Sequence, residues 1–275
     1  MRPLEHKRVA LLESRKAQDL AKMVERFGAD VISVPSVREV PRRELAALTV
    51  QRLLDGQFDV LVALTGAACE ALFEESERSG SLDGVVDSLK EMLLVCRGPK
   101  PLGALRRRGL VAGVQTVKPH TSDDLLAALS TVELDGRRVL LLQYGERNQP
   151  FAAALTARGA DVTDLCLYEW ALPEDLRDMK QLIVDTVAGD IDVMLFTSQI
   201  QFRHLLDVAR AIGRADELLR ALRDDVITGS VGPVCTRALR AAGLVPDVIP
   251  PSPNGASLVQ AIADYVSMFG PDEVG

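Results

Sequence analysis

The chain carries one three-part sequence pattern twice, and this internal repeat restricts its fold more than any other feature. The matching segments are residues 8–31 with 138–162, residues 59–66 with 192–198, and residues 98–110 with 232–244. In the third pair, Gly-Pro, Ala-Leu and Gly-Leu dipeptides recur at identical spacing. Such a duplication predicts two related α/β domains, and a pair of domains can place one ligand site between them.

Short apolar runs alternate with segments of helical periodicity along the chain. Lys7–Leu12 is apolar, and Lys16–Phe27 has apolar residues at helical spacing before Gly28, a residue type that often ends helices. Strands that alternate with helices of about 10–15 residues predict parallel sheets with right-handed crossovers. Each set supplies roughly five strands, one of them at Asp247–Ile249, so we expect doubly wound, flavodoxin-like sheets.

The order of the repeats leaves two domain arrangements open. A tandem arrangement gives domains near residues 1–135 and 136–275. An interleaved arrangement joins the first segment of each repeat to the later segments of the other, so that the chain crosses between domains twice. Pro-containing stretches at Val37–Arg43 and Trp170–Asp175 are suitable crossings. The pattern alone favours neither arrangement.

Composition and charge exclude several classes of partner. The chain has 275 residues, a formal charge of −7 and a pI near 5.1, which argues against nucleic-acid and anionic-membrane surfaces. No apolar stretch approaches the roughly 18 residues that span a bilayer. No secretory signal is visible at the N-terminus. We expect a cytoplasmic monomer that binds neither nucleic acid nor membrane.

Cysteine and histidine usage predicts neither a metal site nor a cofactor. The four cysteines form no Cys-x-x-Cys pair and are expected to be buried, reduced thiols: Cys69, Cys96, Cys166 and Cys235. None of the three histidines lies at metal-ligand spacing. His204 is expected at the surface or in a groove. No Gly-x-Gly-x-x-Gly or phosphate-loop motif is present to favour a nucleotide.

Turn motifs over about Lys7–Val266 resemble those of the uroporphyrinogen-III synthase family. They lie at Leu12–Arg15, Thr65-Gly66, Arg97-Gly98, Tyr144–Arg147, Gly159–Val162, Tyr168, Pro173, Thr197-Ser198 and Val231–Pro233. Each motif is generic alone, but their order and spacing are typical of the family. The resemblance implies two flavodoxin-like parallel-sheet domains, interleaved, joined by a two-stranded linker, with the ligand cleft between them. It assigns residues 1–36 with 175–275 to one domain, 44–169 to the other, and 37–43 and 170–174 to the linkers.

The resemblance also implies a reaction. Members of the family cyclise the linear tetrapyrrole hydroxymethylbilane to uroporphyrinogen III, with loss of water and inversion of the terminal ring. The reaction needs no metal or organic cofactor and passes through a cationic azafulvene. Hydroxymethylbilane synthase is the expected transient donor of the substrate.

A polycarboxylate substrate requires many hydrogen-bond donors. Turns at the carboxyl ends of parallel strands present the unpaired N–H groups and partial positive charge of helix N-termini. The residues expected to bind substrate there are Arg15, Thr65, Gly66, Arg97, Gly98, Thr121, Ser122, Tyr144, Gly145, Arg147, Thr197, Ser198, Gly232 and Ser257. The Ser and Thr residues could equally serve only as helix caps, and the arginines could be solvated surface residues. Arg147 falls where the family pattern usually has an arginine.

Tyr168 is the candidate catalytic residue. It is expected to end a strand at the linker, where its phenol could assist loss of the terminal hydroxyl as a general acid. The alternative is a tyrosine packed at the domain junction with its hydroxyl in a hydrogen bond.

The chain departs from the family pattern at a few turns. Cys235 stands where members often have Thr, and Thr65–Ala67 and Thr197–Gln199 replace Thr-Ser-Pro. These departures leave open a second function, a non-catalytic tetrapyrrole-binding or regulatory domain. A two-domain sugar or nucleotide binder is the third possibility.

Overall fold

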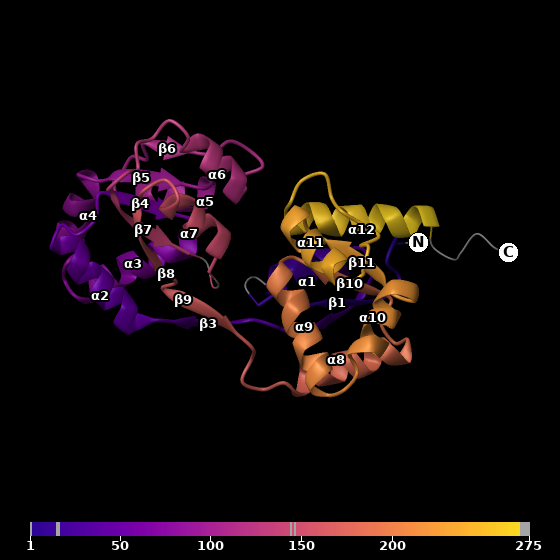
Figure 1. Cartoon of the computed structure of the whole chain (residues 1–275). Coiled ribbons are helices and arrows are strands. Elements are labelled where there is room, and N and C mark those ends of the chain that lie inside the picture. The colour runs from indigo at the N-terminus through magenta and orange to yellow at the C-terminus, as the bar shows by residue number, and fades with distance from the viewer. Residues whose placement is uncertain (1, 15–16, 144, 146, 270–275) are drawn as a thin grey trace. The chain divides into compact units, whose positions relative to one another are not determined.

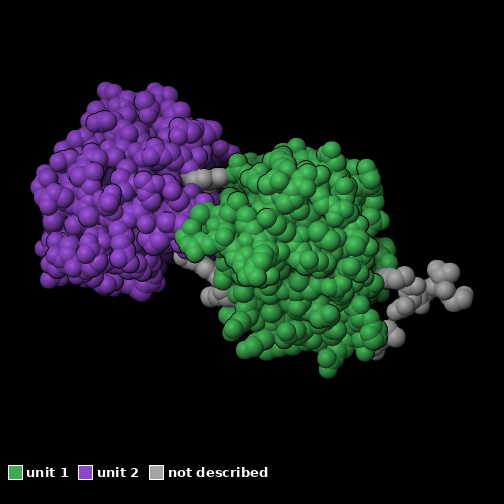
Figure 2. Space-filling view, turned by 90° about the horizontal axis from the view of Figure 1, so that it is seen from below, with its two compact units in different colours: residues 1–38, 171–275 green, residues 39–170 purple. Residues whose placement is uncertain are grey.

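Parallel strands and crossover helices form two α/β units in the computed structural model, which describes residues 2–14, 17–143, 145 and 147–269. Unit 1 comprises residues 1–38 with 171–275, and unit 2 comprises residues 39–170. Figure 2 shows the two units in different colours. Unit 1 is therefore discontinuous in sequence, whereas unit 2 is one continuous segment.

Unit 1 contains a four-stranded parallel sheet with the strand order β11-β10-β1-β2 (Figure 1). Its strands are β1 (Arg8–Leu11), β2 (Asp30–Ser33), β10 (Val193–Phe196) and β11 (Ile227–Ser230). Its helices are α1 (Ala17–Glu25), α8 (Arg177–Ala188), α9 (Gln199–Ala211), α10 (Ala215–Asp224), α11 (Pro233–Ala241) and α12 (Gly255–Phe269). Taken from β2, the strands lie in the order second, first, third and fourth along unit 1, which is how the strand order of a flavodoxin sheet begins.

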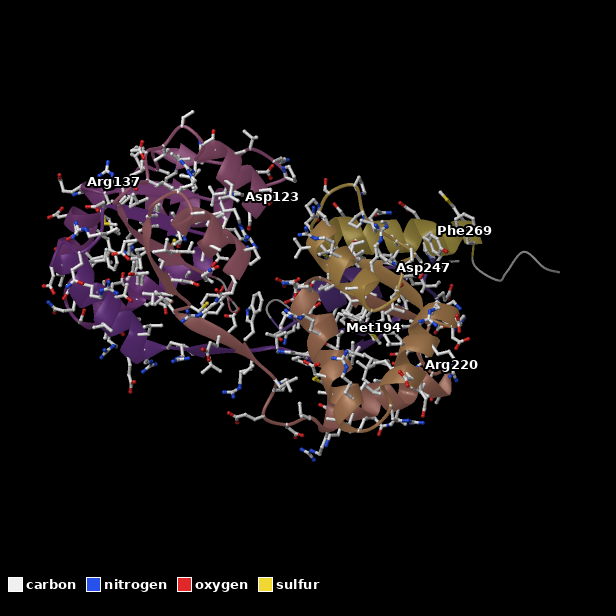
Figure 3. The ribbon with its side chains drawn as sticks, viewed as in Figure 1. Asp123, Arg137, Met194, Arg220, Asp247 and Phe269 are labelled. Atoms are coloured by element: carbon white, nitrogen blue, oxygen red, sulfur yellow. The ribbon has the colours of Figure 1, made fainter. Side chains whose placement is uncertain are left out.

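Side chains of the unit 1 strands alternate between two covered faces. Val9 and Val193 pack with α1 and α12, whereas Ala10 and Met194 pack with α8, α9, α10 and α11. Figure 3 labels Met194 among these elements, and the exposed Arg220 of α10. Because both faces are buried, the strands read as continuous apolar runs in the sequence.

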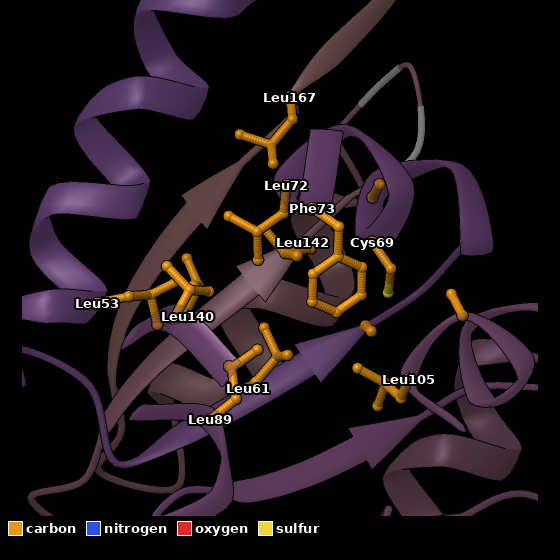
Figure 4. Close-up of a cluster of buried hydrophobic side chains, with 14 of the residues drawn as sticks. Leu53, Leu61, Cys69, Leu72, Phe73, Leu89, Leu105, Leu140, Leu142 and Leu167 are labelled. Atoms are coloured by element: carbon orange, nitrogen blue, oxygen red, sulfur yellow. The ribbon is translucent and has the colours of Figure 1, made fainter. Parts of the chain in front are cut away.

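Unit 2 contains a five-stranded parallel sheet with the order β6-β5-β4-β7-β8. Its strands are β4 (Val60–Ala63), β5 (Leu93–Cys96), β6 (Val114–Gln115), β7 (Arg138–Leu142) and β8 (Asp161–Leu165). Its helices are α2 (Arg43–Leu54), α3 (Gly66–Arg78), α4 (Leu82–Lys90), α5 (Pro99–Arg106), α6 (Ser122–Ala128) and α7 (Gln149–Thr156). Val62 and Leu141 face α6 and α7, and Leu61 and Leu140 face α2 to α5. Figure 4 shows the second cluster, which includes Leu53, Phe73 and Leu140.

A two-stranded sheet of β3 (Arg38–Pro41) and β9 (Tyr168–Ala171) carries both crossings of the chain. The first crossing falls within β3 and the second within β9. The expected fold class, two interleaved parallel-sheet units with a two-stranded linker, is thereby confirmed, and the tandem arrangement is wrong.

Ion pairs at the amino ends of the strands join residues from different repeats. Asp59, before β4, accepts bonds from Nη2 (2.7 Å), Nε (3.1 Å) and the backbone N–H (2.9 Å) of Arg138. Asp192, before β10, accepts from the backbone N–H of Arg8 (2.7 Å) and from Nζ of Lys7 (3.1 Å). The aspartate of each repeat thus binds the basic residue of the other repeat.

Gly109 and Gly243 explain why one Gly-Leu dipeptide recurs. Both have left-handed backbone, with φ of 71° and 78°, a region that glycine enters without steric penalty. They lie just after α5 and α11, and the N–H of the leucine after each donates to a carbonyl five residues earlier at 3.1 Å. The repeated letters therefore encode the same helix ending in each unit.

One expected strand does not form. At Asp247–Ile249 the structure has only an isolated parallel bridge between Gly229 and Val248. The Asp247 carboxylate accepts bonds from the N–H (2.7 Å) and hydroxyl (3.0 Å) of Thr228, so side-chain bonding replaces part of the ladder.

Two helices lie where no element is expected. The segment that forms α4 offers few apolar residues, of which Val85 and Leu89 are buried. The segment that forms α10 buries Leu218, Ala221 and Leu222, and five of its ten residues are charged. None of the helices in the described ranges has both the length and the apolar content needed to cross a membrane.

Candidate functional site

The carboxyl ends of the unit 2 strands carry most of the predicted site residues. Thr65 is the N-cap of α3, Gly98 that of α5 and Thr121 that of α6, and each follows a parallel strand. Each of these residues precedes a helix. The first N–H groups of a helix have no intrahelical partners. The turns therefore present donors along one edge of the sheet.

Thr65 and Tyr168 meet at this edge. The Thr65 hydroxyl accepts a bond from the N–H of Ala68 (3.2 Å) and lies 3.3 Å from the Tyr168 hydroxyl. Tyr168 is buried, with 7% of its surface exposed. It begins β9, whereas we expected it to end the preceding strand, which stops at Leu165. The structure thus gives Tyr168 both a packed ring and a hydroxyl partner.

Gly66 allows two helices of unit 2 to approach closely. A Cβ atom at Gly66 would lie 3.0 Å from the carbonyl oxygen of Lys100 in α5. Any side chain would therefore have to push α3 and α5 apart. This packing role exists whether or not the Gly66 N–H binds a ligand.

A chain of hydrogen bonds links the turns after β5 and β6. The hydroxyl of Thr116, which is buried, donates to the carbonyl oxygen of Arg97. The same hydroxyl lies 2.8 Å from Nδ1 of His120. The His120 ring packs beside Gly98, 3.6 Å from the position of a Cβ there.

The N-termini of α6 and α7 are joined by side chains. Thr121 and Asp124 form a capping box, in which the carboxylate accepts from the Thr121 N–H (2.6 Å) and hydroxyl (2.7 Å). These bonds lower the pKa of the Asp124 carboxyl, and the bond from the backbone N–H of Thr121 has the larger effect. Asn148 caps α7 and donates to the Ser122 hydroxyl at 3.0 Å.

The turn after β7 contains Gly145 and Arg147. Gly145 has a φ of 65°, and a Cβ there would lie 2.2 Å from the Trp170 ring, so only glycine is accommodated. The guanidinium of Arg147 lies 3.9 Å from the Asp164 carboxylate. Among the described residues, neither the buried amide of Gln143 nor Oδ1 of Asp164 has a hydrogen-bond partner. The other predicted donors of these turns, Arg15 in unit 1 and Tyr144 in unit 2, lie outside the described residues.

In unit 1, an acidic side chain occupies the carboxyl edge of the sheet. The Thr197 hydroxyl donates to the carboxylate of Glu13, which follows β1. Gln201 of α9 donates to the Thr197 hydroxyl (2.8 Å), and its carbonyl accepts from the N–H groups of Thr197 (2.8 Å) and Ser198 (3.2 Å). The N–H groups of the two residues before α9 are therefore already bonded to Gln201.

Gly232 and Ser257 lie at helix starts in unit 1. Gly232 is the N-cap of α11, and a Cβ there would lie 2.9 Å from Pro253. Ser257 lies in the first turn of α12, where its N–H donates to the Asn254 side chain at 2.9 Å. Cys235, the departure from the family pattern, is buried in α11.

His204 is not at the surface, so that expectation is wrong. It is buried on α9, with Nδ1 2.7 Å from the carbonyl oxygen of Ser36, just before β3. The helical periodicity places His204 on the inward face, since Gln201 and Leu205 beside it are also buried. A carbonyl can only accept, so Nδ1 carries the proton of this bond.

No group of three or more metal-ligating side chains occurs in the described part of the chain. The four cysteines are buried and reduced, as expected. Burial raises the pKa of the Cys96 thiol to about 11 and also raises the pKa values of Cys69 and Cys235. These thiols are therefore poor nucleophiles.

Each edge offers hydroxyls and amide N–H groups. The unit 2 edge also has the Arg147 guanidinium and the Asp124 and Asp164 carboxylates, and the unit 1 edge has the Glu13 carboxylate. They can bind an anionic ligand and can move protons. Sequence reasoning missed Glu13, Thr116, His120, Gln143 and Gln201. Only Gln201 had a local signal, because Ser198-x-x-Gln201 has the spacing of a capping box.

Comparison with known proteins relates most of the chain to one family. The profile of the family described as "Uroporphyrinogen-III synthase HemD" matches residues 18–260. The uncharacterized protein YjjA of Bacillus subtilis (strain 168) is 25% identical over 260 residues, which cover 94% of this chain and 96% of that protein. A mutant uroporphyrinogen III synthase from Thermus thermophilus aligns with a TM-score of 0.76 and 24% identity, covering 96% of this chain and 100% of that one. The wild-type enzyme from the same organism aligns with a TM-score of 0.59 and 27% identity, covering 95% and 98%.

Proposed function

We propose that this chain, which belongs to the uroporphyrinogen-III synthase family, cyclises hydroxymethylbilane to uroporphyrinogen III. The terminal hydroxyl leaves as water, and the terminal ring is inverted as the macrocycle closes. The observation that carries the proposal is the family match over residues 18–260, which includes parts of both units.

The edges of both sheets support binding of a polycarboxylate to an acidic protein. The chain has a formal charge of −7, so long-range attraction does not favour an anion. Local donors at helix N-termini and the guanidinium of Arg147 supply positive potential where the substrate carboxylates would lie. We assign binding to the described members of the predicted set: Thr65, Gly66, Arg97, Gly98, Thr121, Ser122, Gly145, Arg147, Thr197, Ser198, Gly232 and Ser257.

Tyr168 is proposed as the general acid. Its phenol transfers a proton to the departing hydroxyl as the C–O bond breaks, and water and the azafulvene cation form. The Thr65 hydroxyl, 3.3 Å away, can donate to the phenolate that remains. Because Thr65 also accepts a bond from the Ala68 N–H, its orientation is fixed before the reaction.

The remaining expectations stay proposals. They are a cytoplasmic monomer, action without a cofactor, and receipt of the substrate from hydroxymethylbilane synthase.

The test is an isomer assay. Freshly made hydroxymethylbilane is incubated with the protein, the products are oxidised, and the uroporphyrin isomers are separated by chromatography. We expect type III to predominate with native protein, and only type I, from spontaneous closure, with heat-denatured protein. Type I alone from folded protein would contradict the proposal and favour the non-catalytic tetrapyrrole-binding or regulatory role.

A further inference from the structure

His120 has an unusual backbone for a histidine. It follows β6 and precedes α6, and its φ of 63° is in the left-handed region. For a residue with a side chain this conformation is sterically unfavourable. The ring is partly exposed and packs beside Gly98, at the start of α5. The fold therefore holds an imidazole at the carboxyl edge of unit 2.

Hydrogen bonds fix which ring nitrogen carries the proton. The Thr116 hydroxyl has one proton, which it donates to the Arg97 carbonyl. The 2.8 Å bond between this hydroxyl and His120 must then be donated by Nδ1. In the neutral ring Nε2 is therefore an acceptor, and no described residue bonds to it. An oriented imidazole of this kind can accept a proton from a ligand.

The position of His120 relates it to Tyr168. Gly98 follows β5 and Thr65 follows β4, and these neighbouring strands lie about 4.8 Å apart. The N–H of Arg97 donates to the Ala63 carbonyl at 3.1 Å, which ties the two turns together. His120 thus lies after β6 and packs beside the turn after β5, which neighbours the turn of Thr65, the hydroxyl partner of Tyr168.

Several charged residues lie on the elements next to His120. Arg97 and Lys100 lie on the turn and first residues of α5, Lys118 lies in the same loop, and Asp123 and Asp124 lie on α6. The Asp124 carboxylate is bonded to Thr121. Asp123, labelled in Figure 3, is exposed.

We propose that His120 is the catalytic base of the cyclisation, which rests on the proposed function. After water has left and the terminal ring has been inverted, a bridging methylene carbon bonds to the carbon of that ring that still carries hydrogen. Nε2 of His120 takes that proton, the C–H electrons restore the aromatic pyrrole, and imidazolium forms. Tyr168 has given one proton to the leaving water and His120 has taken one, so the reaction is balanced once the imidazolium proton returns to the phenolate through solvent.

His120→Asn is the direct test. Asparagine tolerates left-handed backbone and can still donate to Thr116, but it has no ring Nε2. We expect kcat for uroporphyrinogen III formation to fall about 10²–10⁴-fold, with KM little changed. The limb of the kcat profile that rises with pH should disappear, and added imidazole should restore part of the rate.

His6→Asn is the matched control. His6 is an exposed histidine of unit 1 with a φ of 66°, so this variant makes the same chemical change on similar backbone and should keep wild-type kcat. Should His120→Asn not fold by circular dichroism, His120→Gln replaces it, with the same expected kinetics. A folded His120 variant that keeps the wild-type kcat and pH profile overturns the role of His120 while the wild type still makes type III. Type I alone from the wild type overturns the proposed function and the inference together.

Discussion

Hydroxyl groups at the strand ends of both units already have partners within the fold. The Thr197 hydroxyl donates to Glu13, the Thr121 hydroxyl to Asp124, and the Thr65 hydroxyl accepts from Ala68. A hydroxyl whose proton is engaged can still accept from a ligand, but it can donate only by exchanging its partner. Pyrrole N–H groups therefore suit Thr197 and Thr121 better than carboxylates do, and carboxylates suit the backbone N–H groups and Arg147.

Tyr168→Phe tests the general acid. The ring is buried, so phenylalanine keeps its packing and removes only the hydroxyl that faces Thr65. We expect kcat to fall about 10²-fold or more with KM nearly constant, because a general acid acts mainly in the transition state. Stopped assays of type III formation give both constants. Tyr265→Phe on α12 is the control and should match the wild type, whereas an unchanged kcat in Tyr168→Phe would return Tyr168 to a packing role.

Single residues also show where sequence reasoning reached its limit. The positions of Thr65, Gly98 and Thr197 at strand ends followed from periodicity and turn chemistry. The partners Thr116 and His120 could not be predicted, because they meet through a loop whose path depends on the whole sheet. The burial of His204 was accessible in principle, since it lies on the helical stripe of Leu205 and Val208.

At the level of elements, an ion pair between Asp59 and Arg138 joins the neighbouring strands β4 and β7. The hydrogen bond from the Arg138 side chain, followed by that from its backbone N–H, lowers the pKa of Asp59 from 3.8 to about 2. A carboxyl with a lowered pKa in the folded state stabilises the fold above its ordinary pKa. This contribution is lost as the pH falls from about 4 towards 2.

Asp59→Asn tests this contribution. We expect the free energy of unfolding at pH 7 to fall by about 1 kcal/mol or less, because the pair is partly exposed. The difference from the wild type should shrink as the pH approaches 2, where the wild-type carboxyl is protonated. Urea unfolding at several pH values measures both. The partner variant Arg138→Gln and the double variant complete a thermodynamic cycle, and a difference that stays constant down to pH 2 would contradict the assignment.

Periodicity predicted most of the long elements, but not helices α4 and α10. The buried strands β4, β7 and β10 stand out as apolar runs, and α1, α9 and α12 as amphipathic segments. Helix α10 was missed although its buried residues Leu218, Ala221 and Leu222 have helical spacing. The segment at Asp247–Ile249 has strand composition, but the Asp247 side chain bonds Thr228 where a ladder would form.

For the whole molecule, the two units have separate hydrophobic cores. The clusters around Phe73 and Phe151 lie entirely within residues 39–170, and those around Phe196 and Leu258 lie entirely in the other unit. The duplicated sequence predicted two domains, but the pattern alone did not distinguish tandem from interleaved domains. That choice depends on long-range partners such as Asp59 with Arg138, which a local pattern does not specify.

Residues 39–170 should therefore fold alone. This segment is continuous, contains a complete five-stranded sheet and is of ordinary domain size. We expect a cooperative urea transition and dispersed amide resonances from the isolated segment. A mutant with Phe73→Ala should lose about 3–5 kcal/mol in the same segment. A non-cooperative transition in the unmutated segment would contradict separate cores.

The most direct test of the central claim is the fraction of type III uroporphyrin as protein is titrated against a fixed amount of fresh hydroxymethylbilane. The reaction must outrun spontaneous closure to type I, so catalysis predicts that the type III fraction rises with protein concentration towards completion. A product that remains type I at every concentration of folded protein would contradict the synthase assignment.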